Sequence, residues 1–145
     1  MESEKIIIGI THGDINGIGY EVILKALSDN RILDMFVPVI YGSSKLAGFH
    51  KKNLELQSLN LNVINSLDEV NTKRINIINC VDDELKVELG QSTPEAGKAA
   101  FEALEKATED LKNGKLHAIV TAPINKKNIQ SADFSFPGHT EYLEN

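Results

Sequence analysis

Runs of β-branched residues alternate along the chain with segments of helical periodicity. The first run, Ile6–Ile10, ends at a glycine-containing loop over residues 11–19, and a helical pattern follows. Continuous apolar runs of this length are typical of strands buried on both faces of a parallel sheet. Strands that alternate with helices predict an α/β layer architecture with a mostly parallel sheet.

Four further strands are expected at residues 36–41, 60–64, 74–80 and 118–121, the last of them buried. The helix after the first loop should bury one stripe of apolar residues, formed by Ile18, Val22, Ile23, Ala26 and Leu27. A second helix should begin at the hydroxyl cap Ser43-Ser44 and end near residues 50–52, and a helix-like segment begins at Asn125.

The best-specified helix begins at residues 92–95, Ser-Thr-Pro-Glu. A hydroxyl cap, an early proline and a first-turn carboxylate satisfy and complement the exposed amides of a helix start. Glu102 and Lys106 are spaced to pair, and Asn113-Gly114 should end the helix. Its inward stripe is expected to contain Ala100, Leu104, Ala107, Thr108 and Leu111.

The composition excludes several classes of function. Of 145 residues, 41% are hydrophobic and 25% charged, which is typical of a soluble globular protein. No apolar run approaches the roughly 20 residues of a membrane span, and the N-terminus does not resemble a signal peptide, so no membrane partner is expected. The net charge of −6, without a Lys/Arg block, predicts no nucleic-acid partner. The single cysteine, Cys80, excludes an internal disulfide or a multi-cysteine zinc site in this stretch and fits a cytoplasmic location.

Two loops follow strands and are candidate ligand sites, since ligands of parallel sheets bind at the carboxyl ends of strands. In residues 11–19, glycines at 13, 17 and 19 would let backbone amides approach an anion at a helix start. The spacing lacks the third glycine of the dinucleotide fingerprint and the lysine of a P-loop, so a plain tight turn is the alternative. Asp14 could cap the helix as readily as touch a ligand. In residues 121–127, Lys126 and its neighbour could hold an anionic substrate or lie in a solvated helix start.

The four histidines are not paired at metal-ligand spacing. His50, on a lysine-rich helix end, reads as a solvated cation, and His117 reads as structural. His12 lies in the first strand-end loop and is a candidate for contact with a ligand. His139 follows Pro-Gly and precedes Thr140 and a glutamate, a cluster that suits a polar substrate, although capping of a following helix explains it equally well.

Three segments occur in one order: Thr11-His12-Gly13-Asp14 with Gly17-Ile18-Gly19, then Thr121-Ala122-Pro123-Ile124-Asn125-Lys126, then Phe136-Pro137-Gly138-His139-Thr140-Glu141. Together they resemble the PdxA family of 4-hydroxythreonine-4-phosphate dehydrogenases, which act in pyridoxal phosphate (vitamin B6) biosynthesis. The last segment is the most specific. The resemblance covers about the N-terminal half of a family member, so residues 1–145 are expected to be the N-terminal portion of a longer protein.

The resemblance implies an isocitrate/isopropylmalate dehydrogenase-like fold of two α/β domains with a cleft between them, assembled as a homodimer. It implies NAD or NADP as hydride acceptor and a divalent metal (Zn, Mg or Co) bound by residues beyond this chain. The substrate would be a small phosphorylated hydroxy amino acid, 4-phosphooxy-L-threonine. Its oxidation gives 2-amino-3-oxo-4-phosphooxybutanoate, a β-keto acid that decarboxylates to 3-amino-2-oxopropyl phosphate.

Carried over by position, His139 and Thr140 match the substrate-binding pair of the family. Lys126 matches a recurrent lysine, and it is a further candidate for substrate binding together with Asp14. The resemblance assigns no catalytic residue and no metal ligand within this chain. The loop departs from the usual pattern at three positions, Ile15, Asn16 and Tyr20, which bears on its conformation and on the choice among related phosphohydroxy acids.

Two other interpretations stay open at this point. A phosphate acyltransferase has a similar fold and also binds phosphate, but it would need no downstream metal cluster. Alternatively, the 145 residues are a ligand-binding fragment without catalysis.

Overall fold

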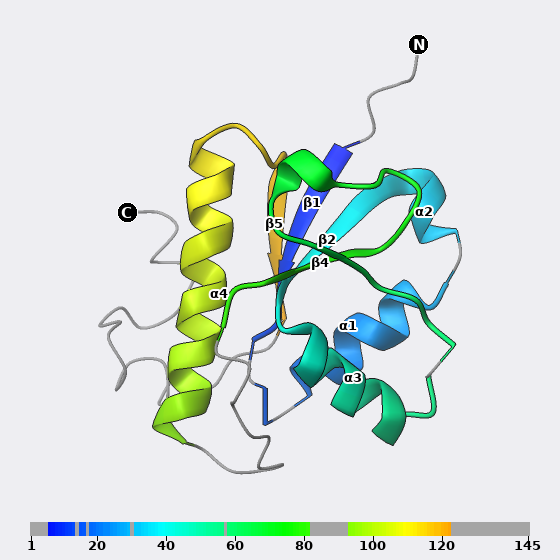
Figure 1. Ribbon diagram of the computed structural model, residues 1–145, viewed down its shortest axis with the longest axis vertical. Helices are drawn as coiled ribbons and strands as arrows, with labels where there is room; N and C mark the ends of the chain where they lie inside the picture. Colours follow the sequence, from blue (N-terminus) through cyan, green and yellow to red (C-terminus); the bar gives the residue numbers. More distant parts are fainter. Residues whose placement is uncertain are drawn as a thin grey trace.

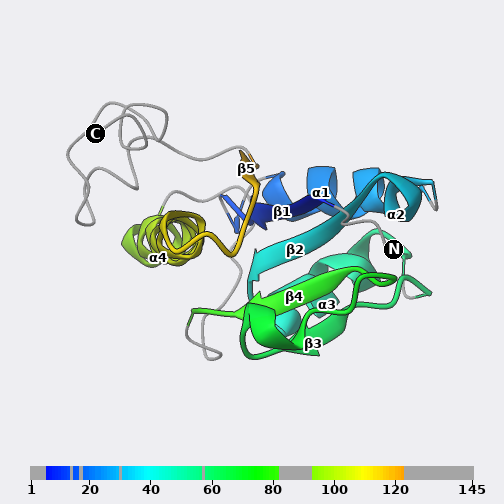
Figure 2. The ribbon, with the colours of Figure 1, turned by 90° about the horizontal axis from the view of Figure 1, so that it is seen from above.

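The protein is described by a computed structural model over residues 6–13, 15–16, 18–29, 31–56, 58–81 and 93–122. Within these ranges, five strands form one sheet with helices on both faces (Figure 1; Figure 2). The elements in chain order are β1 (Ile6–Thr11), α1 (Gly19–Leu27), α2 (Ile32–Met35), β2 (Phe36–Gly42), α3 (Ser44–Asn53), β3 (Asn62–Ile64), the 3₁₀ turn η1 (Leu67–Glu69), β4 (Asn76–Asn79), α4 (Pro94–Lys112) and β5 (Ala118–Thr121).

The sheet has the strand order β3-β4-β2-β1-β5, and all four pairings are parallel. The connection from β4 to β5 contains α4 and crosses over β2 and β1. The predicted α/β architecture with a parallel sheet is confirmed. The strands expected at 60–64 and 74–80 are shorter than predicted, because only residues 62–64 and 76–79 enter the sheet.

Each face of the sheet is covered by different helices, as Figure 2 shows. Because side chains alternate along a strand, neighbouring residues of β2 enter separate cores. Ile40 packs with Leu24 of α1 and Leu46 of α3 on one face. Val39 and Tyr41 pack with alanines of α4 on the other.

The helix caps agree with the sequence. Thr93 accepts a hydrogen bond from the Ala96 amide (3.1 Å), and Pro94 occupies the first turn of α4. Gly114 ends that helix with φ of 77°, a left-handed conformation that suits glycine. Ser43 caps α3 by accepting from the Leu46 amide (3.2 Å). Local hydrogen bonding therefore fixes both helix starts.

Three packing predictions are wrong. In α1 only Ile23 and Leu27 of the expected stripe are buried. Ile18 and Val22 are 56% and 44% exposed, Ala26 is exposed, and Tyr20 and Leu24 are buried instead. The two rows lie on adjacent faces of the helix, and packing on the sheet selects the one that begins at Tyr20.

The strand β5 is half exposed, since among the described residues it pairs only with β1. Lys106 forms its ion pair with Asp110 (3.9 Å), one turn further along than expected, instead of with Glu102.

In the ranges that the structure describes, no helix is long and apolar enough to cross a bilayer.

Candidate functional site

The carboxyl ends of β1, β2 and β5 lie side by side. Thr11 is in register with Tyr41 on one side and with Thr121 on the other. Beyond the strands, the His12 amide donates to the Tyr41 carbonyl and the Ala122 amide donates to the Thr11 carbonyl, both at 3.2 Å. The two loops predicted to form a site therefore leave the sheet at the same edge, which is where ligands of parallel α/β sheets bind.

The start of α4 lies at this same edge. Asn16, in the loop after β1, donates from Nδ2 to Oγ1 of Thr93, the N-cap of α4 (3.4 Å). Ala96 and Ala99, in the first turns of α4, pack in the same core as Ile15 and Ala122. Since helix N-termini carry unpaired amides and a partial positive charge, an anion is favoured at this edge of the sheet.

His12 and Tyr20 form a buried polar pair behind this edge. His12 Nδ1 lies 2.9 Å from the Tyr20 hydroxyl, and Nε2 lies 2.9 Å from the carbonyl oxygen of Ala99. Both side chains are fully buried. Because a carbonyl only accepts, Nε2 carries the proton, and in the neutral ring Nδ1 then accepts the hydroxyl proton of Tyr20. The Tyr20 oxygen in turn accepts from the Ser43 amide (3.0 Å).

Burial sets the protonation of this pair. Desolvation lowers the pKa of His12 to about 4, against an opposing contribution from the Ala99 hydrogen bond. Desolvation likewise raises the pKa of the Tyr20 hydroxyl. At neutral pH the pair is therefore uncharged, and His12 is a structural residue instead of the ligand contact considered from the sequence.

His50 also belongs to this buried group. Its ring stacks on Tyr20 with centroids 5.1 Å apart and an angle of 18° between the planes. Its Nε2 donates to the Ile15 carbonyl (3.1 Å), and burial lowers its pKa. The expectation of a solvated cation is wrong, because the loop after β1 covers this ring and supplies a carbonyl acceptor.

Two glycines make room for the arrangement. Gly13 has φ of 68°, a left-handed conformation that few other residues adopt, directly after His12. At Gly42, the last residue of β2, an added Cβ would touch the Tyr20 hydroxyl and lie 2.7 Å from His12 Nδ1. The end of β2 and the His12–Tyr20 pair are therefore fitted to each other.

The four candidate substrate-binding residues, Asp14, Lys126, His139 and Thr140, lie outside the described residues, as does the helix-like segment from Asn125. Gly13 and Ile15, on either side of Asp14, are described, and the Ile15 carbonyl accepts a hydrogen bond from His50. The structure thus describes the backbone on either side of Asp14 in this loop. The contacts of these four residues remain predictions.

The described residues do not fit a divalent metal. Among them, no group of three histidine, cysteine, aspartate or glutamate side chains could hold a metal ion. His12 and His50 are engaged in the hydrogen bonds above, and His117 accepts at Nδ1 from the Ile7 amide (2.9 Å), which confirms its predicted structural role.

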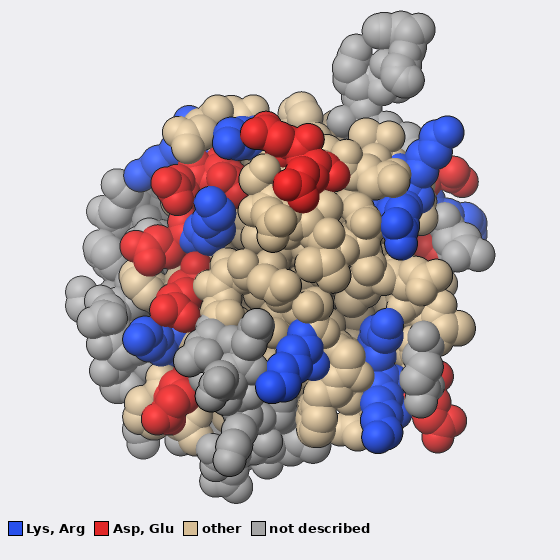
Figure 3. Space-filling view, in the orientation of Figure 1, with Lys and Arg blue, Asp and Glu red and all other residues tan. Residues whose placement is uncertain are grey.

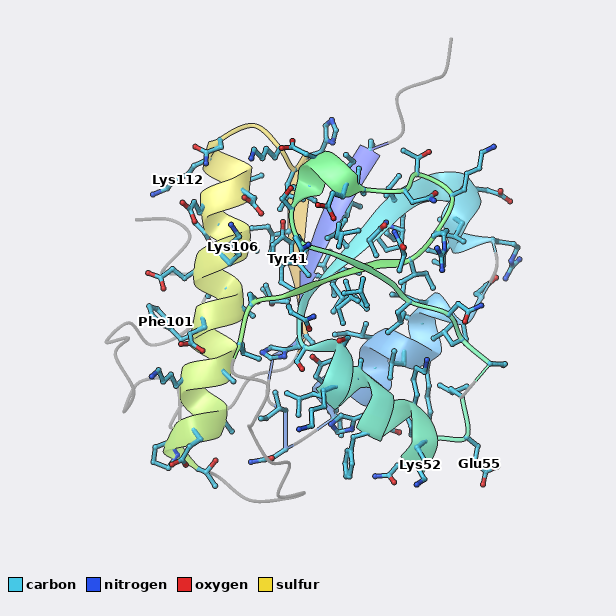
Figure 4. The ribbon with its side chains drawn as sticks, in the orientation of Figure 1. Tyr41, Lys52, Glu55, Phe101, Lys106 and Lys112 are labelled. Carbon is cyan, nitrogen blue, oxygen red and sulfur yellow. The ribbon has the colours of Figure 1, made fainter. Side chains whose placement is uncertain are left out.

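A separate hollow of about 520 Å³ lies along α4 and includes Cys80. Its charged lining consists of Lys106 and Lys112, labelled in Figure 4, together with three glutamates of the same helix, Glu102, Glu105 and Glu109. Figure 3 shows basic side chains interspersed with acidic ones on this face of the molecule. The hollow therefore has no excess of positive charge to favour a phosphate group.

Sequence reasoning missed the residues that organise the strand-end loop. The sequence marks Tyr20 only as a departure from a family pattern and Ser43 only as a helix cap. Tyr20 is hydrogen-bonded to Ser43, 23 positions later in the chain, and His12 is hydrogen-bonded to Ala99, 87 positions later. Neither helical nor strand periodicity signals contacts of this range.

Comparison with known proteins identifies a matching family model and several similar proteins. The family model "Pyridoxal phosphate biosynthetic protein PdxA" matches residues 34–145. A curated 4-hydroxythreonine-4-phosphate dehydrogenase from Bacteroides thetaiotaomicron is 56% identical over 99% of this chain and 39% of its own length. A protein from Oceanobacillus iheyensis, named provisionally as a D-threonate 4-phosphate dehydrogenase, is 35% identical over 97% of this chain and 43% of its own length.

A solved structure has the same fold. The crystal structure of a 4-hydroxythreonine-4-phosphate dehydrogenase from Burkholderia phymatum superimposes with a TM-score of 0.87 at 30% identity. The match covers 97% of this chain and 43% of that structure. The chain thus spans about two fifths of the length of the relatives it matches.

Proposed function

Because the chain belongs to the PdxA family, we propose that the protein containing it oxidises 4-phosphooxy-L-threonine as a 4-hydroxythreonine-4-phosphate dehydrogenase. The observation that carries this proposal is the 56% identity, over 99% of the chain, to the curated dehydrogenase of that name. The strand-end site supports it, since it combines a loop at the end of β1 with the start of α4, where a phosphate or carboxylate is favoured.

In the proposed reaction, the secondary alcohol of the substrate loses a hydride to NAD or NADP and its hydroxyl proton to the medium. The resulting β-keto acid loses carbon dioxide to give 3-amino-2-oxopropyl phosphate. His139 and Thr140 are proposed to bind the substrate, with Lys126 and Asp14 as additional contacts. A divalent metal that takes part in this reaction must be held by residues outside the described ranges.

The proposed setting is a cytoplasmic homodimer in which this chain supplies the N-terminal portion of each subunit. Light scattering of the full-length protein measures the oligomeric state directly. A monomer in that measurement contradicts the homodimer.

The activity is tested by incubating the full-length protein with 4-phosphooxy-L-threonine, NAD or NADP and, in turn, Zn²⁺, Mg²⁺ or Co²⁺. We expect NADH or NADPH to accumulate, followed by absorbance at 340 nm. Absence of turnover with every metal contradicts the proposal.

The competing substrate is D-threonate 4-phosphate, because several relatives at 35–38% identity carry that name. Comparing kcat/KM for the two compounds decides between them. We expect at least a tenfold preference for 4-phosphooxy-L-threonine, in line with the higher identity to the enzyme named for it.

The role of His139 is tested by His139→Ala in the full-length protein. A substrate-binding role predicts a raised KM or a lowered kcat with an unchanged melting temperature. Unchanged kinetics with a lowered melting temperature would instead support helix capping.

A further inference from the structure

The described part of the loop between β1 and α1 is attached to both neighbouring helices. At its start, His12 donates to the Ala99 carbonyl in α4. Further along, the Ile15 carbonyl accepts from His50 in α3. Figure 1 shows α3 and the first turns of α4 near the ends of the strands. The loop is therefore held from two sides by side chains that are themselves buried.

A third attachment comes from Asn16, which donates to Thr93 at the N-cap of α4. Asn16 is 2% exposed, and Ile15 beside it is 1% exposed. Buried residues in a loop that carries binding groups reduce the conformational entropy that the loop loses when a ligand binds. The attachments thus pre-organise this edge of the sheet.

Tyr20 connects two of the three attachments. Its hydroxyl donates to His12 and its ring stacks on His50. The same hydroxyl accepts from the Ser43 amide at the end of β2, so Tyr20 also ties the group to the sheet. Removal of this one hydroxyl leaves His12 Nδ1 and the Ser43 amide buried without their partner, while the ring that stacks on His50 stays.

The residues involved include all three departures noted in the sequence. Ile15 supplies the carbonyl that His50 binds, Asn16 binds the α4 cap, and Tyr20 joins the histidines. Ile15 and Tyr20 therefore meet through His50, and Asn16 adds a separate bond to the N-cap of α4.

We infer that Tyr20, acting through His12 and His50, is a positioning residue that holds the loop after β1 in the conformation that receives the substrate. The inference rests on the proposed function, because it is the proposed substrate that would meet this loop. Tyr20 is buried behind the loop and acts on the substrate only through the conformation of the loop.

The test compares Tyr20→Phe with a matched control, Tyr41→Phe, in the full-length protein. Tyr41 also has a buried hydroxyl bond, to Asp110 Oδ2 (2.7 Å), but on the opposite face of the sheet. We expect Tyr20→Phe to speed amide hydrogen exchange at Ile15 and Asn16 by at least tenfold, and to raise KM three- to tenfold with kcat changed less than twofold. Tyr41→Phe should leave exchange at Ile15 and Asn16 and KM unchanged.

Equal exchange at Ile15 and Asn16 in wild type and Tyr20→Phe overturns the inference, as does faster exchange with an unchanged KM. If the wild-type protein does not turn over 4-phosphooxy-L-threonine, the proposed function fails. In that case the hydrogen exchange still decides whether Tyr20 positions the loop.

If Tyr20→Phe does not fold, His50→Phe takes its place. This variant keeps an aromatic ring against Tyr20 but lacks the N–H that binds the Ile15 carbonyl. Faster exchange confined to the loop, with a raised KM, supports positioning. A lowered melting temperature with unchanged KM and unchanged loop exchange contradicts it.

Discussion

His12, directly after β1, donates a hydrogen bond of 2.9 Å from Nε2 to the backbone carbonyl of Ala99 in α4, 87 positions later in the chain. Within the first turns of a helix the carbonyl of Ala99 already accepts an intrahelical bond, so the histidine uses its second lone pair. The contact fixes the start of α4 against the end of β1. Because the ring is neutral, this junction costs no buried charge.

The fit of Gly42 against this junction gives a first prediction. In Gly42→Ala the new Cβ would collide with the Tyr20 hydroxyl and with His12, which lie on rigid rings in a packed core. Overpacking of this kind costs about 1–3 kcal/mol, so the midpoint of urea unfolding should fall. The control is Gly48→Ala in α3, where a Cβ meets nothing within 4 Å. That change should stabilise the helix by about 0.5–1 kcal/mol, and a Gly42→Ala variant as stable as wild type would contradict the fit.

The lowered pKa of His12 gives a second prediction, on pH. In the unfolded chain an imidazole takes up a proton near pH 6.5, whereas folded His12 does so only at about pH 4. Between these values the unfolded state binds more protons, so stability is complete above pH 6.5 and falls as the pH drops toward 4. The decrease in unfolding free energy that comes from His12 approaches about 3 kcal/mol. The lowered pKa of His50 adds a decrease in the same direction.

The measurement for His12 is the free energy of unfolding between pH 4.5 and 7, in wild type and in His12→Gln. We expect the variant, whose amide does not titrate in this range, to show a smaller slope with pH. Equal slopes in the two proteins would mean that His12 is not the group that responds.

Local signals made α4 and the architecture predictable. Thr93, Pro94 and Gly114 each act through hydrogen bonds or dihedral angles within a few residues, so the local sequence is enough to predict where the helix begins and ends. The parallel sheet follows from the alternation of strands and helices, which is also a pattern along the chain.

The side of α1 that is buried and the state of His50 were not predictable in the same way. Two apolar rows run along α1, and only the position of the sheet decides that Leu24 is buried and Val22 is not. From its place at a lysine-rich helix end, His50 is predicted to be a solvated cation. Only the tertiary structure shows that it donates to the Ile15 carbonyl. Tertiary contacts therefore decide these residues, including the scaffold of the candidate site.

Asn76 gives a third prediction, at the start of β4. This fully buried side chain donates from Nδ2 to the carbonyls of Asn71 (3.0 Å) and Arg74 (2.9 Å), and its Oδ1 accepts from Asn62 Nδ2 (3.0 Å). Asn76→Ala removes these hydrogen bonds from a fully buried position and leaves their part-buried partners without Asn76, so it should cost about 3 kcal/mol in unfolding free energy.

The control for Asn76 is Asn79→Ala at the other end of the same strand. Asn79 is exposed and its Oδ1 accepts one hydrogen bond, from the Ser44 amide. Since water can replace that bond, the loss should be about 1 kcal/mol. Equal losses in the two variants would show that the buried network around Asn76 adds nothing to stability.

The thiol of Cys80 gives a fourth prediction. Burial raises its pKa to about 12, with nearby Glu102 adding in the same direction and Lys106 opposing it. Only the thiolate reacts with iodoacetamide, so raising the pKa from 9.0 to about 12 reduces the reactive fraction roughly a thousandfold at pH 8. Peptide-resolved mass spectrometry should therefore find Cys80 unmodified in the native protein under conditions that fully alkylate it in 8 M urea. A native alkylation rate within tenfold of the unfolded rate would contradict the partly buried, protonated thiol.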